Sequence, residues 1–255
     1  MTKAIGVIPA RWASERFPGK CLAPICGVPL IGRVVAQVRK AACLERVLVA
    51  TDDERIADVA AGAGAEPVMT RADHPSGTDR VAEAVAESDA EIVVNVQGDE
   101  PLIEPGLIEA LTQALSGDAE WDMSTAATPI RDAADVDKPS VVKVVWDASG
   151  RALYFSRSVI PHLRDPSRRP EGTLHWRHLG IYAYRRAFLE RVVNTPVCDA
   201  ERAEALEQLR ALHIGARICV IETDEEGIGV DTPEDVKYVE SIIRKREAGE
   251  SGAGT

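Results

Sequence analysis

The chain has 255 residues, the length of one ordinary α/β domain or of one domain with a small inserted lobe. Hydrophobic residues make up 45% of the sequence, too many for a disordered chain. The net charge of −11 excludes a general nucleic-acid binder, because such a chain repels a phosphate backbone. An anionic substrate would need a local basic pocket.

No targeting or membrane segment is evident. The first apolar run, Ala4–Ala10, is interrupted by Pro9, and no stretch of roughly 18 apolar residues follows it. The five cysteines are scattered and form no C-x-x-C pair, so neither a zinc site nor a disulfide framework is indicated. The sequence therefore predicts a soluble, cytoplasmic protein with no membrane partner.

In the first half of the chain, short apolar runs alternate with helical patterns. This alternation predicts βαβ units, hence an α/β fold with a doubly wound, mostly parallel sheet. The expected strands are Ala4–Ile8, Arg46–Ala50, Glu66–Met69 and Ile92–Val96, and the expected helices are Leu30–Val38, Glu54–Ala61, Asp79–Val85 and Pro105–Leu115.

After residue 120 the pattern changes, because three strands follow one another without helices between them. A turn signal, Asp147–Gly150, separates the last two. We expect one domain over residues 1–246 with an inserted antiparallel lobe around 123–185, and a disordered tail over 247–255. The expected elements are strands Met123–Thr128, Val141–Trp146, Arg151–Phe155 and Ile218–Ile221, an irregular loop over 161–175, and helices Arg185–Val193, Ala200–Leu212 and Pro233–Arg244.

The loop after the first strand carries three cations, Arg11, Arg16 and Lys20, around a Pro-Gly turn. Open α/β sheets place ligands at the carboxyl ends of their strands. Arginine forks pair with phosphate oxygens, and lysine supplies a compact charge. The loop is therefore either a polyphosphate site or a solvated basic loop.

Two aspartates stand at points where a metal could bind. Asp99 follows the buried strand at residues 92–96, and Asp231 precedes a Thr-Pro helix start. Mg²⁺ prefers such hard oxygen ligands and keeps substrate phosphates in its shell. The competing interpretations are a helix cap at Asp99 and helix initiation at Asp231, with Thr232 as the N-cap.

The remaining motifs allow both structural and ligand roles. Ser76 with Asp79 resembles a capping box, although the Ser76-Gly77 segment could also present backbone amides to a nucleotide. In the second half, an Arg, a His, a Tyr and a Glu-Gln pair could together recognise a polyhydroxylated acid. These residues are Arg157, His178, Tyr182, Glu207 and Gln208.

Taken together, the motifs give the chain a strong resemblance to the CMP-KDO synthetases (3-deoxy-manno-octulosonate cytidylyltransferases) from about Ile5 to Val239. CMP-sialate synthetases are related but carry a Gly-Gly-Ser-Lys-type first loop. The strings that carry the resemblance are IPARWASERFPGK (8–20), VATDD (49–53), MTRADHPSGTDR (69–80), VVNVQGDEP (93–101), ALYFSRSVIP (152–161), RHLGIYAYR (177–185), LEQLR (206–210) and GVDTPED (229–235).

The resemblance implies a nucleotidyltransferase version of the α/β fold, with an antiparallel arm that helps form a homodimer. It implies that CTP and KDO give CMP-KDO and pyrophosphate for lipopolysaccharide biosynthesis in the cytoplasm, with Mg²⁺ as cofactor. The implied residues are Arg11, Lys20, Asp99 and Asp231 for catalysis, Asp99 and Asp231 for metal, Ala10, Arg11, Arg16, Lys20, Arg71, Ser76, Gly77 and Gln97 for the nucleotide, and Gln97, Arg157, His178, Tyr182, Glu207 and Gln208 for the sugar acid.

Three other functions compete with this one. A cytidylyltransferase for sialate or for an 8-amino-substituted KDO keeps the chemistry and changes the sugar. A non-catalytic sugar-nucleotide binding module is disfavoured because Lys20, Asp99 and Asp231 are all present. A hydride-transferring enzyme is disfavoured because the dinucleotide glycine fingerprint is missing.

Overall fold

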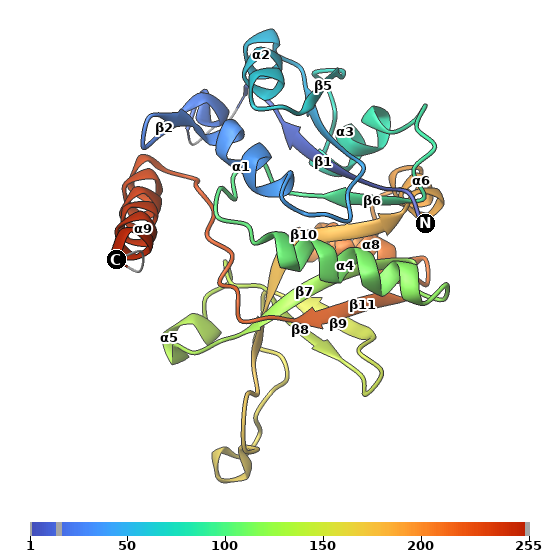
Figure 1. Cartoon of the computed structure of the whole chain (residues 1–255). Helices are drawn as coiled ribbons and strands as arrows, with labels where there is room; N and C mark the ends of the chain where they lie inside the picture. Colours follow the sequence, from blue (N-terminus) through green and yellow to red (C-terminus); the bar gives the residue numbers. More distant parts are fainter. Residues whose placement is uncertain (1, 14–16, 253–255) are drawn as a thin grey trace. The chain divides into compact units, whose positions relative to one another are not determined.

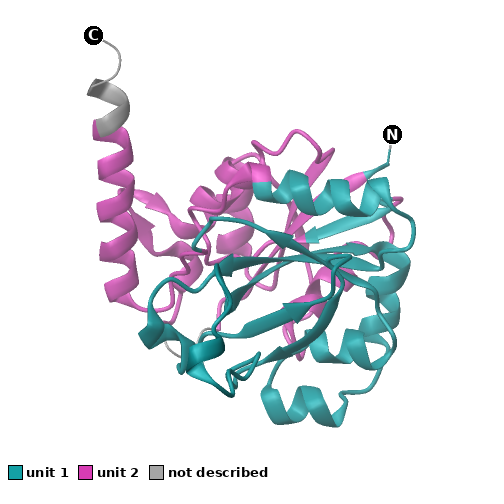
Figure 2. Cartoon of the chain, turned by 90° about the horizontal axis from the view of Figure 1, so that it is seen from below, with its two compact units in different colours: residues 1–3, 90–94, 107–226 teal, residues 4–89, 95–106, 227–255 magenta. Residues whose placement is uncertain are grey.

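The computed structural model of the chain describes residues 2–13 and 17–252, with side chains over 2–13 and 17–248. The chain forms two compact units, which Figure 2 shows in different colours. Unit 1 comprises residues 1–3, 90–94 and 107–226, and unit 2 comprises residues 4–89, 95–106 and 227–255. In the described part of the chain, no helix has the length and apolar character needed to cross a membrane.

Unit 2 is built on parallel strands (Figure 1). β1 (Ala4–Ala10) pairs with β4 (Arg46–Thr51), and β4 pairs with β5 (Glu66–Met69), both in parallel. The unit also contains the 3-10 helix η1 (Lys20–Leu22), the short strands β2 (Pro24–Ile25) and β3 (Val28–Pro29), and the helices α1 (Leu30–Val38), α2 (Glu54–Gly62), α3 (Gly77–Ala84) and α9 (Pro233–Gly252).

The helices of unit 2 begin where the sequence provides caps and apolar stripes. α1 buries residues 30, 31, 34, 35 and 38, the spacing that keeps apolar side chains on one helical face. Asp53 caps α2, where its carboxylate accepts from the Arg55 N–H, and the Ser76 hydroxyl caps α3 by accepting from the Asp79 N–H. The chain thus turns directly from the end of β4 into α2, whereas residues 70–76 separate β5 from α3.

Unit 1 is built around β7 (Met123–Pro129), which pairs antiparallel with β10 (Trp176–Arg185) and parallel with β11 (Ile218–Glu222). β8 (Lys143–Trp146) and β9 (Ala152–Ser156) form a small antiparallel arm that pairs with β10 through β8. The other elements are α5 (Ala133–Val136), the 3-10 helix η2 (Pro166–Arg168), α6 (Arg186–Val193), α7 (Asp199–Glu204) and α8 (Gln208–His213), while β6 (Ile92–Asn95) and α4 (Pro105–Gly117) each have residues in both units.

The α/β class and the antiparallel arm are confirmed. The predicted turn between β8 and β9 is present, with Gly150 at φ +83° and the Asp147 carboxylate accepting from the Ser149 N–H at 2.8 Å. The strand β10 was not predicted, because a glycine and two basic residues interrupt its apolar pattern. Its register shifts between Leu179 and Tyr182, so simple alternation does not describe it.

Two helix predictions were wrong in their extent. The single helix expected over Ala200–Leu212 is two helices, α7 and α8, because Ala205 takes a left-handed conformation with φ +50°. The last helix was predicted to end at Arg244, yet α9 continues to Gly252. Its added turns contain Lys, Arg, Glu and Ala, all strong helix formers.

The break between α7 and α8 gives a stability prediction. A side chain at positive φ costs about 1–2 kcal/mol, whereas glycine adopts this conformation freely at some entropic cost in the unfolded chain. We therefore expect Ala205→Gly to raise the free energy of unfolding by up to about 1 kcal/mol. Urea denaturation measures this, and a loss of stability would contradict the assigned strain.

Candidate active site

A cavity of about 540 Å³ lies within unit 2, in the size range of small-molecule sites. Its walls come from the carboxyl end of β1, η1, the start of α3, the segment after β6 and the segment before α9. The lining residues are Pro9, Ala10, Arg11, Lys20, Cys21, His74, Pro75, Ser76, Gly77, Arg80, Gln97, Gly98, Asp99 and Asp231.

Lys20 joins the two aspartates that the sequence analysis selected. Its Nζ lies 2.7 Å from Asp99 Oδ2 and 3.1 Å from Asp231 Oδ1, although 79 and 211 residues separate the partners in sequence. Burial opposes the charge on Lys20, but the attraction of Asp99 and Asp231 outweighs it and raises the pKa of the ammonium. Lys20 therefore carries its positive charge at neutral pH, between the two aspartate side chains.

The backbone holds this cluster in place. The Val230 N–H donates to the Asp99 carbonyl at 2.8 Å, so the segment before α9 is tied to the segment after β6. The Asp235 carboxylate accepts from the N–H groups of Asp231 and Thr232, and hydrogen bonding from the Asp231 N–H lowers its pKa. Asp235 N–H in turn donates to the Thr232 hydroxyl, so the predicted cap at Thr232 is present beside Asp231.

The segment between β6 and Asp99 passes very close to β1. The Val96 N–H donates to the Val7 carbonyl at 3.0 Å, and a Cβ built on Gly98 would lie only 2.8 Å from the carbonyl oxygen of Pro9. Glycine is the residue that allows this approach. The contact brings Gln97 and Asp99 to the carboxyl end of β1.

Ser76 caps a helix and also lines the cavity. Its hydroxyl caps α3 by accepting from the Asp79 N–H, and it donates to the Asp79 carboxylate at 2.6 Å. Ser76 and Gly77 also line the cavity. The N-terminus of α3, an eight-residue helix, therefore borders the cavity, and a helix N-terminus favours negative charge.

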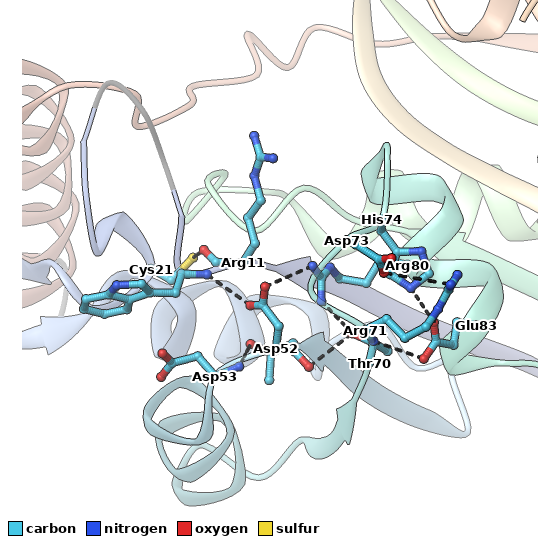
Figure 3. Close-up of polar contacts among 12 residues, drawn as sticks. Arg11, Cys21, Asp52, Asp53, Thr70, Arg71, Asp73, His74, Arg80 and Glu83 are labelled. Atoms are coloured by element: carbon cyan, nitrogen blue, oxygen red, sulfur yellow. Dashed lines mark hydrogen bonds and ion pairs between the residues drawn. The ribbon is translucent and has the colours of Figure 1, made fainter.

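Among the described residues, one predicted nucleotide-binding residue, Arg71, is not part of this lining. Arg16 lies outside the described residues. Arg71 is exposed and contacts Glu83, whose carboxylate accepts its Nε–H at 3.1 Å and also bonds the His74 ring (Figure 3). Burial works against the Glu83 carboxylate, but the Arg71 and His74 bonds outweigh it and lower its pKa. Arg71 is thus tied to a neighbour of the cavity.

The cavity concentrates positive charge in an acidic protein. Its described lining holds Arg11, Lys20 and Arg80 against the carboxylates of Asp99 and Asp231. Burial raises the pKa of the Cys21 thiol to about 11, so this lining cysteine is neutral and no nucleophile. His74 and Arg80 also line the cavity and were not among the predicted site residues, although both lie in the string at 69–80.

A second cluster of predicted residues lies within unit 1. The His178 ring is buried, bonds the Thr125 hydroxyl through Nε2 at 3.0 Å, and packs against Phe155 with ring centroids 4.9 Å apart. The Thr125 hydroxyl reaches the Ile181 carbonyl at 2.9 Å, so it donates there and accepts the Nε2–H of His178. This assignment leaves Nδ1 of a neutral His178 as an acceptor.

Tyr182 and the start of α8 belong to the same cluster. The Tyr182 ring lies 5.5 Å from that of His178, and burial, with a further contribution from the Glu207 charge, raises the pKa of the Tyr182 hydroxyl. Tyr182 therefore remains a neutral hydroxyl. Gln208 is buried at the start of α8, and its Nε2 has no hydrogen-bond partner among the described residues.

Arg157 is anchored at the end of β9. Its guanidinium donates to the carbonyls of Glu204 at 2.6 Å, Pro139 at 2.9 Å and Ala205 at 3.2 Å. Its own carbonyl accepts from the fully buried ammonium of Lys143 at 2.6 Å, and burial lowers the pKa of that lysine. Three of the five guanidinium N–H groups are thus engaged in holding the backbone.

The buried His178 gives a pH prediction. Burial lowers the pKa of His178 from 6.5 to about 3, so between these values the unfolded chain binds a proton that the folded chain does not. The contribution of a neutral His178 to the free energy of unfolding is fully present above pH 6.5. It is lost progressively as the pH falls from 6.5 to about 3. Relative to His178→Gln, the wild type should lose about 2 kcal/mol of stability between pH 6.5 and 4.5. Urea denaturation at both pH values measures the difference, which would stay constant if His178 did not titrate this way.

The chain is similar to cytidylyltransferases over most of its length. The cytidylyltransferase family model matches residues 5–218, so the chain is of the cytidylyltransferase class. The 3-deoxy-manno-octulosonate cytidylyltransferase of Syntrophotalea carbinolica is 52% identical, over 93% of this chain and 97% of its own length. The enzyme of the same name from Solibacter usitatus is 48% identical over 95% of each chain.

A solved structure of CMP:2-keto-3-deoxy-manno-octonic acid synthetase in complex with CTP aligns with a TM-score of 0.91 and 41% identity, covering 96% of this chain and 100% of that one. The chain belongs to the family of 3-deoxy-manno-octulosonate cytidylyltransferases.

Proposed function

We infer that this chain transfers CMP from CTP to the anomeric hydroxyl of KDO and releases pyrophosphate. The similarity to 3-deoxy-manno-octulosonate cytidylyltransferases over nearly the whole chain supports the activity. The observation in the structure that carries the proposal is the cluster of Lys20 with Asp99 and Asp231 in the wall of the cavity. Such a cluster supplies both signs of charge that a nucleotidyl transfer needs.

We propose that Asp99 and Asp231 hold Mg²⁺. Their carboxylates already share one cation, the Lys20 ammonium, and both are hard oxygen donors. The structure shows no group of three or more metal-ligating side chains among its described residues. Two carboxylates suffice for Mg²⁺, which binds through one or two carboxylates and takes its other ligands from substrate phosphates and water. A bound metal would lower the pKa of the attacking hydroxyl and screen the repulsion between two anions.

Arg11 and Lys20 are proposed to bind the triphosphate. A phosphate competes with the aspartates for the Lys20 ammonium, so with nucleotide bound Lys20 would turn from Asp99 and Asp231 towards the phosphate chain. There its charge offsets the negative charge that grows on the leaving pyrophosphate. Arg16, which lies outside the described residues, is proposed as a further phosphate contact.

The base and ribose are proposed to lie against the other wall of the cavity. Ala10, Ser76 and Gly77 line this wall. The exposed Arg71 bonds Glu83, which in turn bonds the lining residue His74. Gln97 lines the same cavity and is proposed to contact both substrates. The N-terminal amides of α3 offer hydrogen bonds to nucleotide oxygens.

The cluster in unit 1 is proposed to bind the sugar acid. Gln208 Nε2 is a buried donor that a sugar oxygen would satisfy, and Nδ1 of the neutral His178 would accept from a sugar hydroxyl. Tyr182 and Glu207 would contact further hydroxyls. Arg157 would meet the carboxylate with the two N–H groups that do not hold the backbone.

The arm β8–β9 is proposed to form a homodimer contact. β9 exposes Leu153 and Tyr154, with relative exposures of 58% and 38%. Exposed apolar side chains on an antiparallel arm suit burial by a second copy. We also propose that the product, CMP-KDO, serves lipopolysaccharide biosynthesis in the cytoplasm.

A crossed assay of pyrophosphate release tests the substrate assignment. CTP or UTP is combined with KDO, 8-amino-KDO or sialate in the presence of Mg²⁺. We expect release with CTP and KDO to exceed every other pair by at least about tenfold in kcat/KM. Turnover with sialate and none with KDO would contradict the assignment of the sugar.

A further inference from the structure

The VATDD string at the end of β4 has no role in the proposed chemistry, yet it makes a dense set of contacts. Asp52 and Asp53 follow β4, and Asp53 also caps α2. Neither aspartate lines the cavity. Asp52 nevertheless bonds Trp12, which comes directly after the lining residue Arg11, and Asp53 bonds Arg55, which stacks on the Trp12 ring.

Asp52 joins two segments of the nucleotide cavity. Its Oδ1 accepts the backbone N–H of Trp12 at 3.2 Å, and its Oδ2 accepts from Arg80 Nη2 at 3.3 Å. The side chains of Arg80 and Asp52 are only 4% and 12% exposed, so solvent screens this pair weakly. Arg80 itself lies on α3 and lines the cavity. Asp52 therefore ties the loop after β1 to the helix that presents Ser76 and Gly77.

Asp53 acts on the ring of the same tryptophan indirectly, by binding Arg55. Its two carboxylate oxygens accept from Arg55 Nε at 2.9 Å and Nη2 at 2.6 Å, a bidentate pair. The Arg55 guanidinium carbon lies 3.5 Å from the centroid of the Trp12 ring, within the range of a cation–π contact. One aspartate thus fixes the backbone of Trp12 and the other fixes its indole.

The Trp12 ring also reaches the far end of the loop. A Cβ built on Gly19 would lie 2.9 Å from Trp12 Cη2, so the indole packs directly on the glycine backbone. Gly19 has φ +70° and precedes Lys20, the first residue of η1. Any shift of the indole would therefore be transmitted to Lys20, and any shift of the Trp12 backbone to Arg11.

We propose that Asp52, and Asp53 acting through Arg55, are positioning residues that hold Trp12 and so set the loop of Arg11 and Lys20 against α3 for binding the CTP triphosphate. This inference rests on the proposed function for its substrate. The purely structural alternative is that these contacts stabilise unit 2 without affecting the nucleotide. The two differ in whether the KM for CTP changes separately from the KM for KDO.

Asp52→Asn is the first test, with Arg46→Met as control. The asparagine has a single acceptor oxygen, so if that oxygen keeps the Trp12 N–H, the amide NH₂ faces the Arg80 guanidinium, and that ion pair is lost. We expect the KM for CTP to rise about tenfold, with the KM for KDO and kcat within about threefold of wild type. Arg46 pairs with Glu66 on the surface of the same unit, so its loss should change neither KM. A rise of less than threefold in the KM for CTP, or an equal rise in both KM values, overturns the proposal.

A second test does not depend on a buried substitution. Arg55 is 57% exposed, so Arg55→Met should fold normally, and Trp12→Leu removes its stacking partner. We expect about a threefold rise in the KM for CTP from Arg55→Met and partial recovery in Arg55→Lys, which keeps the cation. The double variant should match Trp12→Leu alone, because Arg55 acts only through the indole. Multiplicative effects of the two substitutions would contradict the proposed route.

Calorimetric titration with CTP and Mg²⁺ separates this inference from the proposed function. If the wild type binds CTP but does not turn over KDO, the proposed function fails, and the same fold-changes are read from the Kd for CTP. If the wild type binds no CTP, both proposals fail. Equal CTP affinity in wild type and Asp52→Asn overturns the positioning role alone.

Discussion

Asp99→Asn should lower kcat for CMP transfer by at least about 100-fold, which corresponds to about 2.7 kcal/mol of transition-state stabilisation. Asn keeps the size and one acceptor oxygen of Asp but removes the negative charge that attracts a divalent cation. Asp231 remains as a single carboxylate, so CTP should still bind, with an affinity within about tenfold of wild type. Single-turnover kinetics and calorimetric titration with CTP measure the two effects separately.

The control for this substitution is Asp58→Asn. Asp58 is an exposed residue of α2, and removing its charge changes the net charge of unit 2 by the same amount. Its kcat should equal that of wild type. Unchanged turnover in Asp99→Asn would remove Asp99 from the metal site, whatever its effect on CTP binding.

Lys20→Met is expected to lower kcat/KM for CTP by at least about 100-fold, because it removes a cation from the phosphate-binding wall. It also leaves Asp99 and Asp231 facing each other without the ammonium that now bridges them at 2.7 and 3.1 Å. Two uncompensated carboxylates repel one another. The variant should therefore be less stable than wild type, and Mg²⁺ should restore more of its stability than it adds to wild type.

Thermal unfolding with and without Mg²⁺ measures this second effect. Lys40→Met serves as control, since Lys40 is an exposed residue that bonds Gln37 and has no contact with the aspartates. If Mg²⁺ raised the Tm of Lys20→Met and of wild type equally, the proposal that Mg²⁺ binds Asp99 and Asp231 in place of the Lys20 ammonium would be contradicted.

The elements that could be predicted from the sequence are those with a local cause. α1 has apolar residues at helical spacing, and β5 (Glu66–Met69) is short and bounded by turn residues, so both were predicted with their observed ends. The break between α7 and α8 depends on the conformation of one alanine, Ala205, whose residue type gives no signal for positive φ. β10 depends on pairing with β7, which is more than 40 residues away in sequence.

The same distinction holds for the site. Lys20, Asp99 and Asp231 were selected from separate motifs and from a resemblance, and the structure brings them within hydrogen-bonding distance of one another. Ser76 could be assigned to a cap because its partner is three residues away. The contacts of Asp52 with Trp12 and Arg80 span 40 and 28 residues, so no local pattern predicts them.

The negative charge of the chain, −11 in total, is not spread evenly over the residues that the structure describes. The described cavity lining is richer in cations than in carboxylates, and both of its carboxylates, Asp99 and Asp231, face Lys20. The acidic excess therefore lies elsewhere on the chain. Such a distribution repels nucleic acid in general while allowing one small polyanion to bind.

The most direct measurement of the central claim follows the phosphorus atoms of CTP in the presence of the wild-type protein, KDO and Mg²⁺. Phosphorus NMR should show the α-phosphorus of CTP converted to a phosphodiester, as in CMP-KDO, with an equal amount of pyrophosphate, and no conversion without KDO. Release of inorganic phosphate with CDP, or pyrophosphate release that does not depend on KDO, would contradict attack of the sugar on the α-phosphorus.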